Sequence, residues 1–413
     1  MNSKERILEA IKHREPDRVP IFEICISNQV AEYYLGKKVY VWGTGSTTKA
    51  AIETEMKDKE EYKKFMNDCF RNALEVYYKA GLDMIPIYPT AFVTPINFGL
   101  HNVAIAEIYN VEIIKESETV FKLISKDPEA PGFWCSCKYS PDSDTFAMYR
   151  DNIVEKGVEE FERYVEYLEN KNLTIIPEQL KYGLEGLYNA IEVNNKEYNL
   201  SLLGFADIEY PCFQTFHTLF LELMITNGEL VHRYMRATTD SMMEMLKIEL
   251  EMGVDGVLGA NDWAYRNAPM MSPKQFDEFM APYLKKIVDI THEYRKFYIK
   301  HLDGNTYPIL DSLVNNCGID AYHAIEPTAG MDIKKVKDMY GDKITVVGNI
   351  DCGEVLVNWS PNEIKDEVKK IINLVSPCGG HIFGSSNAIH GGIPIENFLA
   401  YIEAAKKYGV YPI

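Results

Sequence analysis

The chain has 413 residues, of which 46% are hydrophobic and 25% are charged, as in a globular protein that buries a large core. Its formal net charge of −18 opposes binding to a phosphate backbone, so nucleic acid is excluded as an expected partner. The polar N-terminal segment lacks the apolar core of a signal peptide, and no run approaches the roughly 18 apolar residues that span a bilayer, so we expect a cytoplasmic protein without membrane contacts.

The first half of the sequence predicts helices alternating with short strands. A helix is expected within residues 1–15, with Ser3 as its N-cap, and a turn and an apolar strand follow at 16–24. Residues 59–80 have the apolar spacing of a long helix that ends at Gly81, and a second strand follows at 83–88. Residues from about 95 to 195 are rich in Tyr, Asn, Glu and Lys and predict strand pieces, a helix at 157–170 and an elaborated insertion.

From residue 199 the sequence alternates regularly between short apolar runs and amphipathic helical patterns. Strands are predicted at 200–206, 256–260, 297–301, 321–325, 344–348 and 380–384, and helices at 228–252, 272–295, 307–316, 333–340, 361–375 and 395–408. With the two early strands this makes eight, which favours closure into a (β/α)₈ (TIM) barrel. An open doubly wound sheet would carry a GxGxxG turn after its first strand, and none is present. We therefore expect an α/β single-domain barrel over residues 1–413, with an N-terminal helical extension and an insertion around 95–195.

Polar residues follow the predicted strands, at the end of a barrel where active sites lie. They are Asp207, Glu209, Asn261, Asp262, His301, Asp303, Asn305, His323, Glu326, Asn349, Asp351, Ser385, Ser386, Asn387 and His390. Because loops from strand to helix also favour Asp, Asn and Ser as helix caps, a structural role stays open for several of them, including Asp207. The predicted substrate-binding residues are Asp207, Asn261, Tyr322 and Asn387.

The segment His301-Leu-Asp303-Gly-Asn305 predicts a metal site. Residues i and i+2 of an extended chain point to the same side, so the imidazole and the carboxylate can both project into the barrel mouth. Two such donors, with a third from another loop, match a catalytic site of three protein ligands and an open position. His390 is the expected third ligand, and Glu326 could compete for that place or act as a fourth. A hydrogen-bonded pair of His301 and Asp303 without a metal is the alternative.

Several motifs resemble the uroporphyrinogen decarboxylase superfamily, whose fold is a (β/α)₈ barrel. They are SKERILEAIKHREPDRVP at 3–20, the strand at 296–301 that ends in His, ITVVGNID at 344–351 and IPIENFLAYIEAAKKYG at 393–409. The decarboxylase itself carries an arginine-rich stretch after the first strand, which binds the carboxylates of its porphyrinogen. Residues 22–34 here contain no Arg or Lys, and a polycarboxylate would meet Glu23 and Glu32 instead. The chain is more similar to the corrinoid-linked methyltransferase branch.

This resemblance implies a zinc site and a methyl transfer. Coenzyme M enzymes of that branch bind zinc with a His-x-Cys motif and a second Cys near the C-terminus. His301 matches the His, Asp303 replaces the first Cys, and His390 falls near the second. Replacing thiolates by harder ligands gives a more Lewis acidic zinc ion, which suits an ether oxygen as leaving group. The resemblance thus implies O-demethylation of a small methylated substrate, with the methyl passing to Co(I) of a separate corrinoid protein.

Further expectations follow from this comparison. Asp262, Tyr265 and Glu326 are candidate catalytic residues for proton delivery or support of the ligands. The chain has no Asp-x-His-x-x-Gly motif, so we expect the cobalamin to arrive on a partner protein. Homodimer formation is also expected. Three alternatives remain: a lyase that acts on a small carboxylic acid with Asp262 as general acid, methyl transfer from methyl-corrinoid to another acceptor, and a non-catalytic corrinoid- or ligand-binding module.

Overall fold

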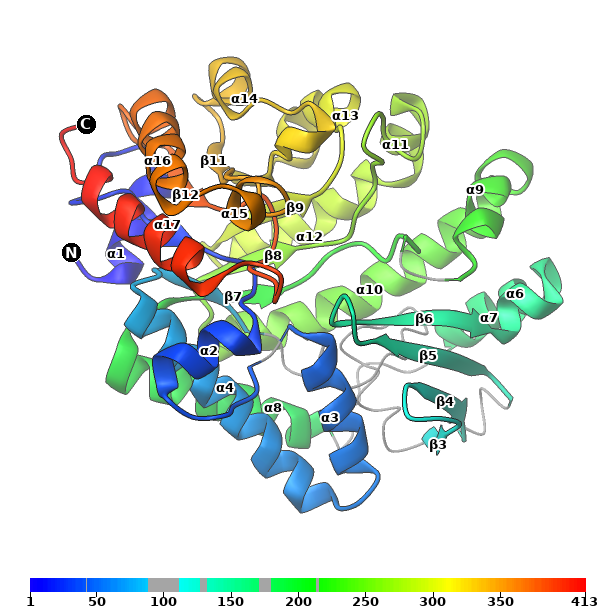
Figure 1. Ribbon diagram of the computed structural model, residues 1–413. Helices are drawn as coiled ribbons and strands as arrows, with labels where there is room; N and C mark the ends of the chain where they lie inside the picture. The colour runs from blue at the N-terminus through cyan, green and yellow to red at the C-terminus, as the bar shows by residue number, and fades with distance from the viewer. Residues whose placement is uncertain (42, 88–110, 127–131, 171–179, 213–214) are drawn as a thin grey trace.

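A computed structural model describes residues 1–41, 43–87, 111–126, 132–170, 180–212 and 215–413. Eight parallel strands close into a barrel in the order β1-β12-β11-β10-β9-β8-β7-β2 (Figure 1). The strands are β1 (Ile21–Phe22), β2 (Met84–Pro86), β7 (Ser201–Phe205), β8 (Gly256–Gly259), β9 (Phe297–Leu302), β10 (Ala321–Ala324), β11 (Thr345–Val347) and β12 (His381–Gly384). Every residue of these strands is buried, since helices cover the outside and side chains fill the inside. The predicted TIM barrel is confirmed.

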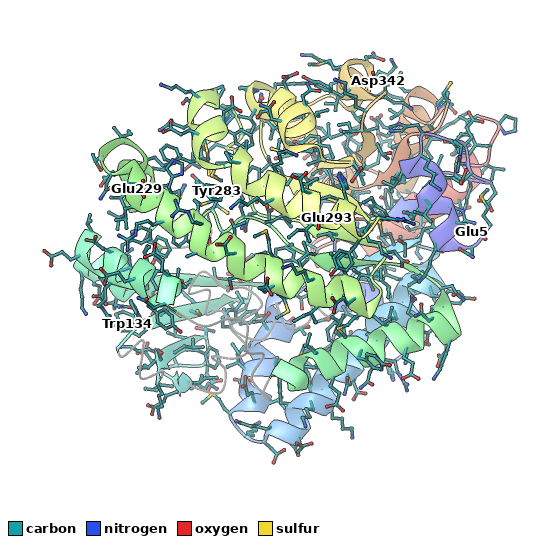
Figure 2. The ribbon with its side chains drawn as sticks, turned by 180° about the vertical axis from the view of Figure 1, so that it is seen from behind. Glu5, Trp134, Glu229, Tyr283, Glu293 and Asp342 are labelled. Atoms are coloured by element: carbon teal, nitrogen blue, oxygen red, sulfur yellow. The ribbon has the colours of Figure 1, made fainter. Side chains whose placement is uncertain are left out.

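The six helical patterns predicted in the second half are helical in the structure, and two further helices, at 217–226 and 355–358, were not predicted. The helices of this half are α9 (His217–Thr226), α10 (Gly228–Met252), α11 (Pro273–Phe279), α12 (Ala281–Glu293), α13 (Tyr307–Ser312), α14 (Ile333–Tyr340), α15 (Val355–Asn358), α16 (Pro361–Val375) and α17 (Ile395–Tyr408). The pattern at 272–295 is two helices, with a break at Met280. Figure 2 shows α10 and α12 side by side on the outside of the barrel, where the Tyr283 hydroxyl lies 3.0 Å from Nδ1 of His232.

The N-terminal helices are α1 (Ser3–Ile11), α2 (Asn28–Leu35), α3 (Gly45–Glu55) and α4 (Lys59–Ala80). The predicted N-cap of α1 was wrong by one residue, because Asn2 accepts from Glu5 N and the Glu5 side chain accepts from Asn2 N. The Ser3 hydroxyl instead donates to Asp83. Helix α4 ends at Gly81 as predicted, since Gly81 takes the left-handed conformation (φ 79°) that costs glycine little.

The insertion between β2 and β7 holds a separate four-stranded antiparallel sheet. Its strands are β3 (Val111–Lys115), β4 (Val120–Ser125), β5 (Trp134–Ser140) and β6 (Thr145–Asp151), and its helices are α6 (Asn152–Lys156), α7 (Val158–Asn170) and α8 (Leu180–Val193). Asp144, in the turn between β5 and β6, accepts from Ser46 N at 2.6 Å and so caps the first turn of α3. Part of the predicted insertion, including 95–110, lies outside the described residues.

The order of the strands places the site. Strand β9 pairs with β8 on one side and with β10 on the other, and His301 and His323 are opposite each other in the register. The carboxyl ends of these three strands therefore meet at one edge of the barrel. Among the described residues, no helix combines the length and the apolar character needed to cross a membrane.

Candidate functional site

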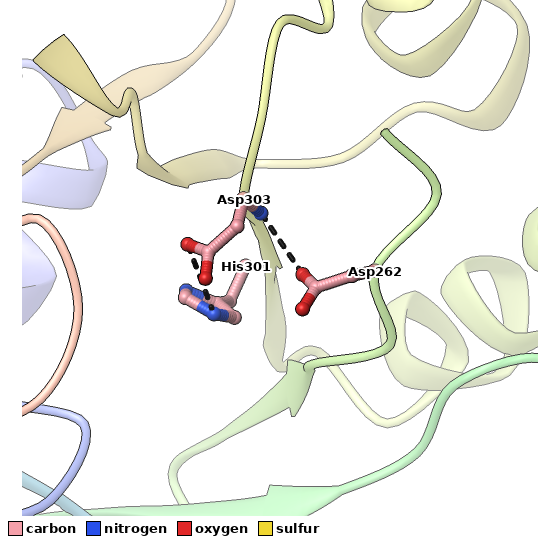
Figure 3. Close-up of side chains that lie close together, drawn as sticks. All are labelled: Asp262, His301 and Asp303. Atoms are coloured by element: carbon pink, nitrogen blue, oxygen red, sulfur yellow. Dashed lines mark hydrogen bonds and ion pairs between the residues drawn. The ribbon is translucent and has the colours of Figure 1, made fainter. Parts of the chain in front are cut away.

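Three potential metal ligands meet at this edge. Asp262 follows β8, His301 lies in β9 and Asp303 follows β9, and their ligand atoms are within 4.8 Å of one another (Figure 3). His301 Nε2 lies 3.6 Å from Asp303 Oδ1. Two ligands of one tetrahedral zinc ion are roughly 3.4 Å apart at ordinary bond lengths. His301 and Asp303 therefore lie at a distance that one zinc ion could bridge, and Asp262 is a third potential ligand next to them.

One of the two facing atoms lacks a hydrogen-bond partner among the described residues. This atom is Asp303 Oδ1, which is buried. The distance of 3.6 Å between His301 Nε2 and this oxygen is longer than a hydrogen bond. A buried carboxylate oxygen without a donor is costly, and a cation between it and an imidazole lone pair removes that cost. One imidazole and two carboxylates also suit zinc chemically, so these residues fit the metal that the sequence comparison implies.

Burial and mutual repulsion change the titration of this cluster. Burial and the nearby carboxylates of Asp262 and Glu326 raise the pKa of Asp303 to about 8. Burial also raises the pKa of Asp262, where Glu326 adds to the effect. The pKa of His301 is lowered to about 3 by burial and by the positive charge of Lys300. The site thus holds a neutral imidazole beside carboxyl groups that gain stability as anions when a cation binds.

The loop after β9 is fixed by backbone contacts. Gly304 has φ 86°, and a Cβ there would come within 2.6 Å of the Tyr265 carbonyl oxygen, so glycine is required. Glu326 Oε2 accepts from Gly304 N at 2.8 Å, and Asp262 Oδ1 accepts from Asp303 N at 2.9 Å. Glu326, a predicted catalytic residue, therefore fixes the loop after β9 (residues 303–305, here called the ligand loop) through its hydrogen bond with Gly304 N. Asn387, a predicted substrate-binding residue, donates from Nδ2 to Asp303 Oδ2.

His390 is not among the three clustered residues, and Tyr265 is exposed. His390 is exposed, its Nδ1 accepts from Gly392 N, and its Nε2 lies 3.2 Å from the Cys352 carbonyl oxygen. Asp262, and not His390, completes the three-ligand cluster in this structure. A ligand role for His390 stays a prediction. Tyr265 is 56% exposed, and its catalytic role stays a prediction.

The other predicted substrate-binding residues lie in the interior. Asp207 is fully buried, and its Oδ2 accepts from Lys300 Nζ at 2.5 Å and from Asn261 N at 2.8 Å. Asn261 in turn donates to the Ile208 carbonyl. The hydroxyl of the fully buried Tyr322 lies 2.5 Å from that of Thr306. These contacts favour the structural alternative for Asp207 and Asn261, and their substrate contacts stay predictions.

Two groups were not assigned a role from the sequence. His323 Nδ1 lies 2.7 Å from His301 Nδ1, a contact that the register of β9 and β10 could have predicted. Glu23 is the second such group. It is 1% exposed and lies beside Ser385 and Tyr401, so its carboxyl group supports the end of β12.

Comparison with known proteins agrees with this architecture. The sequence profile of the uroporphyrinogen decarboxylase (URO-D) family matches residues 154–408. The chain belongs to this family. It is 26% identical over 246 residues to the uroporphyrinogen decarboxylase of Pseudoalteromonas atlantica and 26% identical over 244 residues to that of Vibrio campbellii. These alignments cover 56% and 54% of this chain, and 65% and 64% of the two relatives, so the chain spans less than two thirds of their length.

A solved structure resembles nearly the whole chain. The methyltransferase from Methanosarcina mazei aligns over 99% of both chains, with a TM-score of 0.64 and 17% sequence identity. At this identity the similarity shows that the two proteins share a fold. It covers the N-terminal part as well, which lies outside the match to the URO-D profile.

Proposed function

We propose that the protein is a zinc-dependent methyltransferase that passes the methyl group of a small methyl ether to the Co(I) of a corrinoid on a separate protein. The observation that carries the proposal is the facing pair of His301 Nε2 and Asp303 Oδ1, 3.6 Å apart, with Asp262 beside them. The fold shared with the Methanosarcina methyltransferase supports the choice within the family. The single-domain extent of residues 1–413 and homodimer formation stay predictions.

The ligand set suits an oxygen leaving group. His301, Asp303 and Asp262 would hold the metal, which would supply Lewis acidity toward the ether oxygen. Asn387 and Glu326 keep the Asp303 loop in place, so the two carboxylates need little reorganisation. The exposed Tyr265 hydroxyl is the candidate to deliver a proton to the departing oxygen.

The surroundings of the first strand argue against a porphyrinogen substrate. No Arg or Lys occurs in residues 22–34, where a polycarboxylate would need cations. The second candidate is nevertheless a lyase, because the curated relatives are decarboxylases. In that reaction Asp262, whose pKa is raised, would donate a proton to a small carboxylic acid substrate.

Elemental analysis followed by a methyl-transfer assay tests the proposal. We expect close to one zinc per chain and methylation of a reduced corrinoid protein by at least one methoxylated compound. Protein stripped with a chelator should be inactive and should recover with zinc. A metal-free protein that releases CO₂ from a small carboxylic acid would instead support the lyase.

A further inference from the structure

We propose that His323 is a positioning residue that fixes the tautomer of His301, so that Nε2 is the nitrogen available to a metal. The proposal deepens the metal-binding part of the proposed function and rests on it. It concerns which ring nitrogen carries the hydrogen, so it can be tested in the metal-free protein and without any methyl-transfer assay.

The Ser385 carbonyl group determines which nitrogen of His323 carries the hydrogen. His323 Nε2 lies 3.0 Å from the Ser385 carbonyl oxygen. Because a carbonyl oxygen can only accept, Nε2 of His323 carries the hydrogen. In a neutral ring Nδ1 then has a lone pair and accepts from His301 Nδ1, 2.7 Å away. The hydrogen of His301 is thereby placed on Nδ1, and its Nε2 lone pair is left toward Asp303.

The reverse arrangement, in which His323 Nδ1 donates to His301 Nδ1, requires a buried cation. If His323 donated from both nitrogens it would be an imidazolium ion, yet the residue is 1% exposed and its ring packs edge-on against Phe22, with centroids 5.6 Å apart. An unpaired buried cation is unfavourable. His301 would then carry its hydrogen on Nε2 and would need a partner there. Asp303 Oδ1, at 3.6 Å, is too distant to accept a hydrogen bond.

The hydrogen-bonded series formed by the Ser385 carbonyl, His323 and His301, here called the relay, is held in place by the barrel strands. Ser385 follows β12, and its backbone N donates to Glu23 Oε1 at 3.1 Å, just beyond β1. The rings of His301 and His323 lie 4.8 Å apart on neighbouring strands. The relay therefore runs through the ends of four strands, and the orientation of the metal-facing imidazole does not depend on a surface loop. Outer hydrogen bonds of this kind fix ligating imidazoles in metal sites.

NMR of the metal-free protein labelled with ¹⁵N-histidine tests the tautomer directly. Long-range ¹H–¹⁵N correlations at neutral pH should show His301 protonated on Nδ1 and His323 protonated on Nε2, with signals assigned by the loss of one ring in His301→Ala and His323→Phe. A His301 ring protonated on Nε2, or a doubly protonated His323, would overturn the proposal.

Zinc affinity, measured by competition with a chromophoric chelator, provides the second readout. His323→Phe keeps an aromatic ring but removes the acceptor, so affinity should fall about 10- to 100-fold. His323→Gln retains an acceptor and should recover part of the loss. His381 is the matched control, because it is equally buried and its Nε2 lies 2.9 Å from the Gly348 carbonyl oxygen, away from the site. His381→Phe should leave zinc affinity unchanged.

The outcomes separate this inference from the proposed function. Equal losses of affinity in His323→Phe and His381→Phe, in proportion to lost stability, would show a merely structural role and overturn the positioning role. Tight zinc binding with the opposite His301 tautomer would overturn the inference while the proposed function stands. If the wild type binds no zinc, the proposed function fails, and the NMR experiment still decides the tautomer.

Discussion

Asn387, in the loop after β12, donates a hydrogen bond from Nδ2 to Oδ2 of Asp303, which lies 84 residues earlier in the chain. The bond connects the last strand of the barrel to the ligand loop after β9. It occupies one carboxylate oxygen and leaves Oδ1, the oxygen without a hydrogen-bond partner among the described residues, facing His301. The Asp303 carboxyl group is thus oriented by a neutral donor, which would not compete with a bound cation.

Asn387→Ala should weaken zinc binding about tenfold, because an outer hydrogen bond to a ligand carboxylate is lost. Asn387→Asp should weaken it further, since the donor becomes a like charge beside Asp303. Titration with a competing chelator measures both effects, and circular dichroism checks that the barrel stays folded. An alanine variant with wild-type affinity would mean that Asn387 does not orient the ligand.

The third ligand can be identified by comparing two substitutions. Asp262→Asn should lower zinc affinity more than about 100-fold, because it removes an anionic ligand while preserving its shape. His390→Ala should change affinity less than about threefold, because both of its ring nitrogens contact backbone groups outside the cluster. Metal content after dialysis distinguishes the two. Loss of metal from His390→Ala with retention in Asp262→Asn would restore His390 as the third ligand.

This contrast shows which parts of the site the sequence could predict. His301 and Asp303 are separated by one residue along an extended strand, so their proximity follows from local geometry. The path of the 385–393 loop depends on distant contacts, including the bridge between Ile26 and Ile389. Local sequence carries little information about such contacts, so the absence of His390 from the three-residue cluster could not be predicted from it.

The barrel itself was predictable for a different reason. Its strands are short apolar runs separated by amphipathic helices, and burial on both faces makes these runs stand out. The residues of α10, Gly228–Met252, coincide with the predicted helix because Asn227 caps its start and Gly253 ends it in the left-handed conformation. In contrast, the structural role of Asp207 depends on its hydrogen bond with Lys300, which lies in a strand 93 residues later. A sequence pattern does not identify such a partner.

Zinc affinity should depend on pH. Because the pKa of Asp303 is raised to about 8 in the metal-free protein, its carboxyl group is protonated below that pH and a metal must displace the proton. Affinity should therefore rise about tenfold per pH unit as pH approaches 8, and should level off above it. Calorimetry in buffers of different ionisation enthalpy measures the released proton. Asp303→Asn should bind more weakly but with a flatter profile, and a wild-type affinity independent of pH would contradict the assignment.

Glu23 should make the protein less stable as pH rises. Burial raises its pKa to about 7 from an ordinary value of 4.5, although hydrogen bonds from Ser385 and Tyr401 oppose this shift. A protonated Glu23 also fits the geometry. The Ser385 hydroxyl lies 2.5 Å from Glu23 Oε2 and 2.9 Å from the Asn387 carbonyl oxygen, and its single hydrogen can serve only one of them. If the Ser385 hydroxyl donates to Asn387, the Glu23 carboxyl can donate to Ser385.

Proton binding to Glu23 determines whether stability rises or falls with pH. The folded state binds the Glu23 proton more tightly than the unfolded state, so this contribution to the free energy of unfolding is complete below pH 4.5 and is lost as pH rises through about 7. The glutamine of Glu23→Gln cannot ionise. Urea unfolding should therefore show that the free energy of unfolding falls less between pH 5 and pH 8 in this variant than in the wild type, by on the order of 2 kcal/mol. Some decline should remain, because the pKa of Glu55 is also raised to about 7 by burial. Glu403→Gln, which alters an exposed carboxylate, is the control and should keep the wild-type decline. Parallel declines in the wild type and Glu23→Gln would show that Glu23 is ionised in the folded protein at both pH values.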